Sequence, residues 1–165
     1  MAGVEVLDTS ALVSWAVDAL EGGFVVDGQR EEVNRVAPER ILAIEAARLN
    51  WITPSNGSLK EATEIAMETG DIVGLSKTDL SLLALAIEKG GRMHTDDYRL
   101  QNLCSVAGLE WSSVDSEGIS RVWSWELRCP GCGDVPQAKS RTLRSDESAG
   151  DCKSCGSALV LSRKR

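Results

Sequence analysis

The feature that most constrains the fold of this chain is the alternation of short apolar runs with helical periodicity over residues 1–115. Five runs of strand type fall at 4–7, 24–26, 51–53, 93–95 and 109–114. The segments between them carry apolar residues at helical spacing and predict helices over 10–20, 29–36, 38–49, 58–69, 76–89 and 98–106. Strands that alternate with helices usually pair in parallel, with the helices covering the sheet. The pattern therefore predicts an α/β fold with a central parallel sheet flanked by helices.

Two of the expected helices begin with a recognisable signal. Ser58 with Glu61 has the spacing of a capping box. Ser76 and Asp79 have the spacing of an N-cap and its third helical position. Asp79 is thus open to two interpretations, helix capping or a role in a functional site.

The chain after residue 115 lacks this alternation and carries four of the five cysteines. They form two CxxC pairs separated by nineteen residues, and each pair is followed by glycine. This spacing is typical of a zinc site, and glycine permits the tight turn between two ligands. Disulfides are the alternative, but the start MAGVEVLDTS lacks the basic segment of a signal peptide. We expect one structural Zn²⁺, closed to substrate because its four ligands are all cysteines: Cys129, Cys132, Cys152 and Cys155.

Length and charge give the expected domain organisation. We predict an α/β domain at 1–115, a linker at 116–123 and a zinc ribbon with a basic tail at 124–165. Residues 1–115 hold 19 acidic against 9 basic residues, whereas residues 116–165 hold 6 against 9. An acidic body favours cations and a basic tail favours phosphates. No run is long enough for a membrane span, and we expect a cytoplasmic protein without a membrane partner.

Acidic residues stand where the expected strands end. Asp8 closes the first strand, and Asp96 with Asp97 closes a later one. In a parallel α/β sheet the carboxyl ends of strands face the ligand site, so these acids should meet at one edge. Asp8 could instead cap the helix that follows it, and Asp97 could be a solvated acid or a helix cap. Carboxylates without histidine favour Mg²⁺ or Mn²⁺, and such a cluster suits phosphodiester hydrolysis. The lone histidine, His94, is expected to be structural.

Three stretches then carry a resemblance. DTSAL at 8–12, LSKTDLSLLALA at 75–86 and HTDDYRLQN at 94–102, together with TGD at 69–71 and the cysteine ribbon, resemble the Nob1 family of PIN-domain endonucleases in its short archaeal form. The resemblance implies a PIN fold and an endoribonuclease that uses one or two Mg²⁺ or Mn²⁺ ions. It also implies cleavage of single-stranded RNA, leaving 5′-phosphate and 3′-hydroxyl ends, at the 3′ end of small-subunit (16S) precursor rRNA. Its partners would be the precursor small ribosomal subunit and assembly-factor proteins.

The resemblance also assigns residues. Asp8, Asp79 and Asp96 would be the first, third and fourth metal-binding acids, with Asp97 as a catalytic helper. The stretch VVDGQREEV places Glu32 at the second acid, with Glu31 and Glu45 as alternatives. The supporting hydroxyls that would orient these carboxylates are Thr9, Ser76 and Thr95.

The basic tail is expected to hold RNA through its phosphates. The residues concerned are Arg128, Lys139, Arg141, Arg144, Arg163, Lys164 and Arg165. Trp123 and Trp125 flank the joint, where they either pack between the domains or stack on an unpaired base. Two other functions stay open from the sequence: a toxin-type PIN ribonuclease acting on tRNA or mRNA, and a non-catalytic RNA-binding assembly factor.

Overall fold

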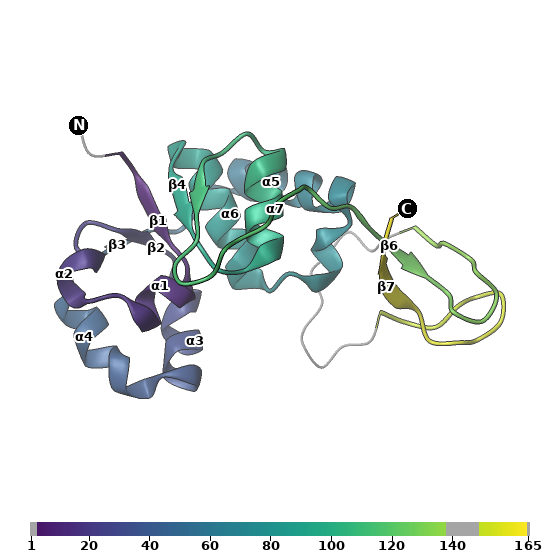
Figure 1. Ribbon diagram of the computed structural model, residues 1–165, viewed down its shortest axis with the longest axis horizontal. Helices are drawn as coiled ribbons and strands as arrows, with labels where there is room; N and C mark the ends of the chain where they lie inside the picture. Colours follow the sequence, from purple (N-terminus) through teal and green to yellow (C-terminus); the bar gives the residue numbers. More distant parts are fainter. Residues whose placement is uncertain (1–2, 138–148, 165) are drawn as a thin grey trace.

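The structure of the protein is a computed structural model that describes residues 3–137 and 149–164. A five-stranded sheet in the order β3-β2-β1-β4-β5 forms its centre, and every pairing in it is parallel (Figure 1). The strands are β1 (Glu5–Leu7), β2 (Phe24–Val25), β3 (Asn50–Trp51), β4 (Arg92–His94) and β5 (Trp111–Ser112). The predicted α/β architecture with a parallel sheet is confirmed.

Helices connect these strands. They are α1 (Thr9–Ser14), α2 (Val17–Leu20), α3 (Gly28–Val36), α4 (Ile41–Ala46), α5 (Asn56–Thr69), α6 (Lys77–Lys89) and α7 (Tyr98–Val106). Two short 3-10 helices, η1 (Pro38–Arg40) and η2 (Asp71–Gly74), precede α4 and α6. None of the described helices is long and apolar enough to cross a membrane.

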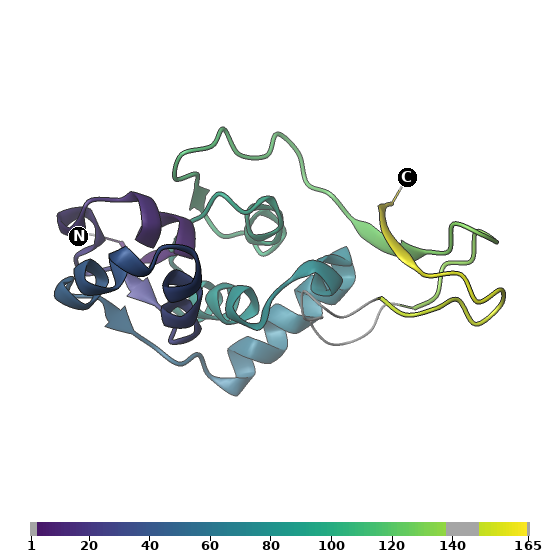
Figure 2. The same cartoon turned by 90° about the horizontal axis from the view of Figure 1, so that it is seen from below.

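The two faces of the sheet bury separate hydrophobic clusters, because side chains alternate along a strand. Val6 of β1 packs with residues of α5, α6 and α7, whereas the next residue, Leu7, packs with α1, α3 and α4. Every residue of Leu82–Ala86 in α6 is buried. Figures 1 and 2 show α5, α6 and α7 grouped apart from α1–α4. This layering anchors the carboxyl ends of β1 and β4 at the middle of the sheet.

The helix expected over 10–20 is two helices, and this prediction was wrong. The backbone is extended at Trp15 and Ala16, between α1 and α2. The guanidinium of Arg40 donates to the carbonyl oxygens of Leu12 and Trp15, which a continuous helix would have used internally. The break places the Trp15 ring edge-on to His94, 5.0 Å away. His94 also contacts Glu5, a contact that suits the structural role expected of it.

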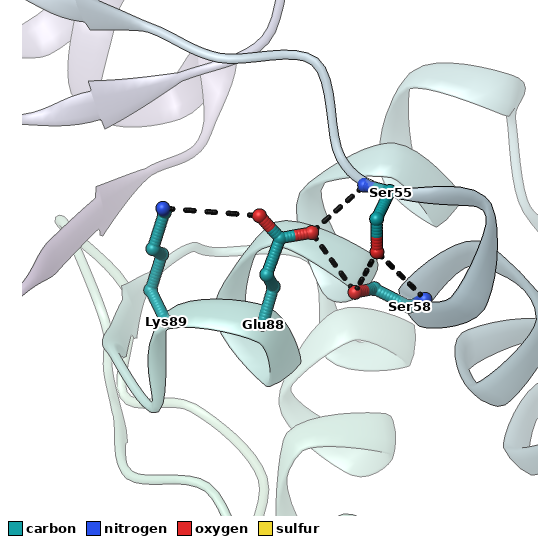
Figure 3. Close-up of polar contacts among 4 residues, drawn as sticks. All are labelled: Ser55, Ser58, Glu88 and Lys89. Atoms are coloured by element: carbon teal, nitrogen blue, oxygen red, sulfur yellow. Dashed lines mark hydrogen bonds and ion pairs between the residues drawn. The ribbon is translucent and has the colours of Figure 1, made fainter.

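The capping box predicted at Ser58 and Glu61 was also wrong. Helix α5 begins two residues earlier, and its N-cap is Ser55, whose hydroxyl accepts from the backbone N–H of Ser58. Figure 3 shows the reason: Glu88 of α6 accepts from the Ser55 N–H and from the Ser58 hydroxyl, at 2.8 and 2.9 Å. A carboxylate distant in sequence therefore fixes where α5 starts. These bonds hold the pKa of Glu88 below its usual range.

The C-terminal part forms a separate antiparallel sheet of β6 (Trp125–Arg128) and β7 (Val160–Arg163). In both views it lies at one end of the long axis (Figures 1 and 2). Leu127 of β6 is buried in the same cluster as α5, α6 and α7, and it continues that core into the C-terminal part. Trp125 offers its carbonyl oxygen so close to Gly70 that a Cβ on Gly70 would lie 1.8 Å from it.

Candidate active site

Asp8 is the first residue after β1 and the N-cap of α1. Its side chain is buried and accepts three hydrogen bonds: from the Thr9 N–H at 2.7 Å, the Thr95 hydroxyl at 2.6 Å and the Ser10 hydroxyl at 3.3 Å. Thr95 follows β4, the strand next to β1, so the parallel sheet brings the two residues side by side. Burial raises the pKa of Asp8, with Asp97 and Glu32 adding to the shift through repulsion. Asp8 thus caps helix α1 and also lies near the other acids, Asp97 and Glu32.

Glu32 lies on α3 and is half-buried. The Thr9 hydroxyl donates to its carboxylate over 2.7 Å, which fixes it beside Asp8. The alternatives lie elsewhere: Glu31 is exposed, and Glu45 is exposed and lies 3.7 Å from the guanidinium of Arg30. Of the three glutamates weighed as the second acid, Glu32 is the one that the fold brings to Asp8.

Asp79 enters from the first turn of α6. It forms a full capping box with Ser76, in which each backbone N–H donates to the other residue's side chain at 3.0 Å. Burial raises the pKa of Asp79 to about 6, and repulsion from Asp97 and Asp8 contributes to the shift. The pKa of a carboxylate that only capped the helix would not be raised by Asp97 and Asp8. Asp79 therefore belongs to the acidic cluster as well as to the helix cap.

The two adjacent aspartates after β4 point in different directions. Asp96 accepts hydrogen bonds from the backbone N–H groups of Val114, Asp115 and Ser116 and from the Ser116 hydroxyl, at 2.8 to 3.2 Å. These donors lower the pKa of Asp96, although its own desolvation acts in the opposite direction. Asp97 instead repels both Asp8 and Asp79. The repulsion indicates that Asp97 is near Asp8 and Asp79, whereas hydrogen bonds join Asp96 to the loop after β5.

We call Asp8, Glu32, Asp79 and Asp97 the acidic cluster. Its donors are all carboxylate oxygens, and hydroxyls or backbone N–H groups orient all four of its members. Like charges gathered in this way are stabilised by a cation, and hard divalent ions prefer such ligands. The cluster is open: within the described ranges, only the cysteines converge tightly enough to form a closed group of ligands. The donor chemistry fits Mg²⁺ or Mn²⁺.

The four thiols at the far end form that closed group. Their sulfurs all lie within 4.8 Å of one another, with Cys129 to Cys155 at 3.3 Å and Cys132 to Cys152 at 3.6 Å. A tetrahedral zinc ion with bonds of about 2.3 Å requires sulfurs about 3.8 Å apart. Gly133 and Gly156 have φ of +77° and +76°, and their N–H groups donate back to the carbonyls of Cys129 and Cys152. The expected glycine knuckles are present, and the cluster fits zinc.

The comparisons with known proteins agree with this geometry. The profile of the family described as "PIN domain of ribonuclease" matches residues 6–88. Endoribonuclease Nob1 of Methanothermobacter thermautotrophicus is 32% identical over 98% of this chain and 94% of its own length. Endoribonuclease Nob1 of Pyrococcus abyssi is 30% identical over 97% and 94%.

The chain belongs to the Nob1 family of PIN-domain endoribonucleases. Ribonuclease VapC1 of Thermoplasma acidophilum is also similar, at 31% identity over 80% of this chain and 69% of its own length. The matches to the two Nob1 proteins reach past β5 and include the cysteine cluster, because they cover nearly all of both chains. The recognition of the Nob1 family from the sequence is confirmed.

Other residues predicted for the Nob1-type site are placed as follows. Thr9, Ser76 and Thr95 all bond to the carboxylates that they were expected to orient, or to the backbone beside them. Arg163 and Lys164 are exposed at the end of β7, while Arg128 is held by Glu126. Lys139, Arg141, Arg144 and Arg165 lie outside the described residues. Cys104 is fully buried, and burial raises its pKa to about 12.

Sequence reasoning missed a set of buried polar side chains that hold the site. Gln29 accepts from the Val26 N–H and donates to the Leu7 carbonyl, and so ties β1 to β2. Gln101 donates to the Thr95 carbonyl and accepts from the Ile119 N–H. Asp71, the acid of the TGD stretch, accepts from Thr69 and Asn102. The only advance signal was polarity within apolar periodic segments, which does not distinguish a buried polar residue from an exposed one.

Proposed function

We propose that the protein is a Mg²⁺- or Mn²⁺-dependent endoribonuclease that cuts single-stranded RNA, with precursor small-subunit (16S) rRNA as its substrate and its mature 3′ end as the cleavage point. The observation that carries the proposal is the acidic cluster at the carboxyl edge of β1 and β4. The near full-length similarity to two proteins named endoribonuclease Nob1 supports the choice of substrate.

Asp8, Glu32, Asp79 and Asp97 would hold the divalent ions, and Asp97 replaces Asp96 as the fourth acid in this proposal. When bound, one or two such ions supply positive charge that activates a water and stabilises the leaving oxygen. The water attacks phosphorus, the bond from phosphorus to the 3′ oxygen breaks, and the products carry 5′-phosphate and 3′-hydroxyl ends.

The side chains of the protein prepare this step by fixed orientation. The Thr95 hydroxyl aims one oxygen of Asp8, and the Thr9 hydroxyl aims Glu32. The capping box holds Asp79 through one oxygen, Oδ2, and leaves the other for a ligand. Carboxylates held before substrate arrives need no reorganisation during the reaction, which lowers its barrier.

The four cysteines would hold one structural Zn²⁺, and Arg163, Lys164 and the rest of the basic tail would contact phosphates. Their role is to position RNA, because contacts to the phosphate backbone carry little sequence information. Arg163, at the end of β7, and Lys164, directly after it, are exposed and can supply this positive charge. Precursor small subunits and assembly factors are the partners that this function implies.

The direct test is incubation of the full chain with an RNA spanning the 3′ end of small-subunit rRNA, with Mn²⁺ or Mg²⁺, followed by mapping of the ends. Cleavage at the mature end is expected. The variants Glu32→Gln and Glu45→Gln form a matched pair: the first should lose more than about 100-fold in rate and the second should change less than about twofold. Loss of activity only in Glu45→Gln would overturn the assignment of Glu32.

A second candidate function rests on the similarity to the protein named ribonuclease VapC1. A toxin-type ribonuclease would cut tRNA or mRNA. Offering the rRNA fragment, a total tRNA fraction and an unrelated mRNA at equal concentration separates the two. Preferential cleavage of tRNA or mRNA would replace the rRNA proposal.

A further inference from the structure

A pocket of about 270 Å³ opens beside the acidic cluster. One wall is the start of α7, with Asp97, Tyr98, Arg99 and Asn102. The other wall is the segment that leads into β6, with Trp123 and Trp125. Because Asp97 belongs both to the pocket and to the acidic cluster, a group in this pocket would lie next to the reacting phosphate.

We propose that this pocket binds one unpaired nucleobase of the RNA strand, adjacent to the phosphate that is cut; the inference rests on the proposed endoribonuclease function. Aromatic rings and a small open pocket suit a flat base, since every base presents a π-face for stacking. The subsite therefore takes single-stranded RNA, whose bases are free to turn out of the strand.

The aromatic residues divide into two roles. The guanidinium carbon of Arg163 lies 3.1 Å from the centroid of the Trp123 ring, and that of Arg121 lies 4.1 Å from it. The Trp123 ring thus has two positive charges against it, and these charges suit the phosphates of a bound strand. Trp125 and the exposed Tyr98 have no such cation or ring partner among the described residues, and their faces are the ones available to a base.

The pocket is formed before RNA arrives, because hydrogen bonds from Asn102 of α7 hold the backbone of Trp123 in the opposite wall. The Asn102 amide donates to Asp71 at 2.9 Å and to the Trp123 carbonyl at 2.7 Å, while its oxygen accepts from the Trp123 N–H. Gly70 packs against the Trp125 carbonyl on the other side. With both ends of its amide in use, Asn102 fixes the walls and has no free group to read a base edge. We infer recognition of a base by stacking, with little preference among the four.

Charge favours RNA over a protein side chain as the occupant. Three arginines, Arg99, Arg121 and Arg163, lie at or near the pocket, and Asp97 is the one acid that lines it. An acid that would itself hold a divalent ion does not repel the strand when the ion is bound. A polyanion with flat apolar bases matches both the arginines and the rings.

The test uses a single-stranded RNA of twelve nucleotides and a set of copies in which one abasic residue occupies each position in turn. Binding to the full chain is measured by fluorescence anisotropy with Ca²⁺ in place of Mg²⁺ and Mn²⁺, so that a divalent ion offsets the charge of the acidic cluster, and gel analysis of the RNA checks that it stays intact. The wild type should lose at least about fivefold in affinity at one or two adjacent positions. That loss should disappear in Trp125→Leu and Tyr98→Leu and persist in Tyr98→Phe.

Val106→Ala, on the same helix but outside the pocket, and Trp51→Leu, a tryptophan elsewhere, should keep the positional loss. Tyr98 is 58% exposed, so Tyr98→Leu keeps the test valid if Trp125→Leu fails to fold. A uniform abasic effect, or one unchanged in both leucine variants, would overturn the inference. A positional effect in a protein that cuts no RNA after Mn²⁺ is added would support the pocket and contradict the proposed function instead.

Discussion

The Thr95 hydroxyl donates to the carboxylate of Asp8 over 2.6 Å and also accepts from the backbone N–H of Asp97 over 3.0 Å. The Thr95 side chain thereby links the ends of the neighbouring strands β1 and β4. It fixes the carboxylate of Asp8 next to the backbone of Asp97. The hydrogen bond lowers the pKa of Asp8, against the larger effect of burial.

Thr95→Val tests this link with little change in shape. Removal of the hydroxyl should raise the pKa of Asp8 further, so that protons compete better with the divalent ion. We expect cleavage at subsaturating Mn²⁺ to fall about tenfold near pH 6.5, which is about 1.4 kcal/mol, and to recover at higher pH or higher Mn²⁺. Thr95→Ser, which keeps the hydroxyl, should behave like the wild type. A Mn²⁺ titration at two pH values decides it, and a loss in Thr95→Val that neither change rescues would contradict the explanation.

Asp97→Asn and Asp96→Asn compare two adjacent carboxylates with different contacts. Asp97→Asn should lose more than about 100-fold in cleavage rate at saturating Mn²⁺ and keep its fold. Asp96→Asn should retain most of the rate while unfolding more easily by about 1 kcal/mol, because it weakens the bonds to residues 114–116. Single-turnover cleavage and urea unfolding measure the two effects. The reverse pattern would restore Asp96 as the metal-binding acid.

The stability of the metal-free protein should depend on pH through Asp79. Its pKa rises from 3.8 to about 6 in the folded state. The folded protein therefore binds a proton more tightly than the unfolded chain does, and the free energy of unfolding should increase as pH falls from 8 to 5. Asp79→Asn should flatten this dependence and raise stability at pH 8 by about 1 kcal/mol.

Asp18→Asn, at an exposed position of α2, is the control and should leave the pH dependence of the wild type unchanged. Urea unfolding of the three proteins at several pH values is the measurement. The free energy of unfolding of each variant is compared with that of the wild type at the same pH, so that any effect of zinc loss in acid is common to both and cancels. If the free energy of unfolding changes equally with pH in the wild type and in Asp79→Asn, the pKa of Asp79 is not raised in the folded protein.

Two glycines that end helices test the contact between α5 and the C-terminal part. Gly70 and Gly90 both have positive φ, at +79° and +59°, and end α5 and α6. A Cβ on Gly90 would meet no other atom, so Gly90→Ala should lower the free energy of unfolding by about 1 kcal/mol through its backbone conformation alone. Gly70→Ala also drives its Cβ into the Trp125 carbonyl and should cost at least about 2 kcal/mol more. Equal losses in urea unfolding would mean that β6 does not rest on Gly70 in solution.

Cys152→Ser tests the role of the cysteine cluster. It should remove zinc and unfold the C-terminal part, because that part has little core of its own, while the five-stranded sheet stays folded. RNA binding should weaken and its salt dependence should flatten, since Arg163 and Lys164 are no longer held in place. Cys104→Ala is the matched control: it removes a buried thiol from α7 and should keep one zinc per chain.

Zinc content, far-ultraviolet circular dichroism and RNA affinity from low to moderate salt give the three readouts. An unchanged affinity and salt slope in Cys152→Ser would assign the ribbon to protein contacts instead of RNA. Retention of zinc by Cys152→Ser would contradict the four-cysteine site itself.

The sequence determined the features that depend on local or periodic information. Alternating runs predicted the parallel sheet, because side chains must alternate in strands and follow a 3.6-residue period in helices. Paired CxxC motifs with glycine predicted the closed thiol group, because the turn that joins two ligands is local. The sequence predicted that Asp8, Glu32 and Asp79 lie near one edge, because the carboxyl ends of parallel strands and the helices that follow them meet there.

Tertiary structure decided which of two adjacent acids faces the cluster and where two helices begin or break. Asp96 and Asp97 are equal in the sequence, but donors from residues 114–116 hold Asp96 and leave Asp97 to face Asp8. Arg40 ends α1, and Glu88 sets the start of α5, each from far along the chain. The pocket beside Asp97 exists because Asn102 of α7 binds the backbone of Trp123. Such hydrogen bonds join residues that become neighbours only after folding, so no local pattern in the sequence encodes them.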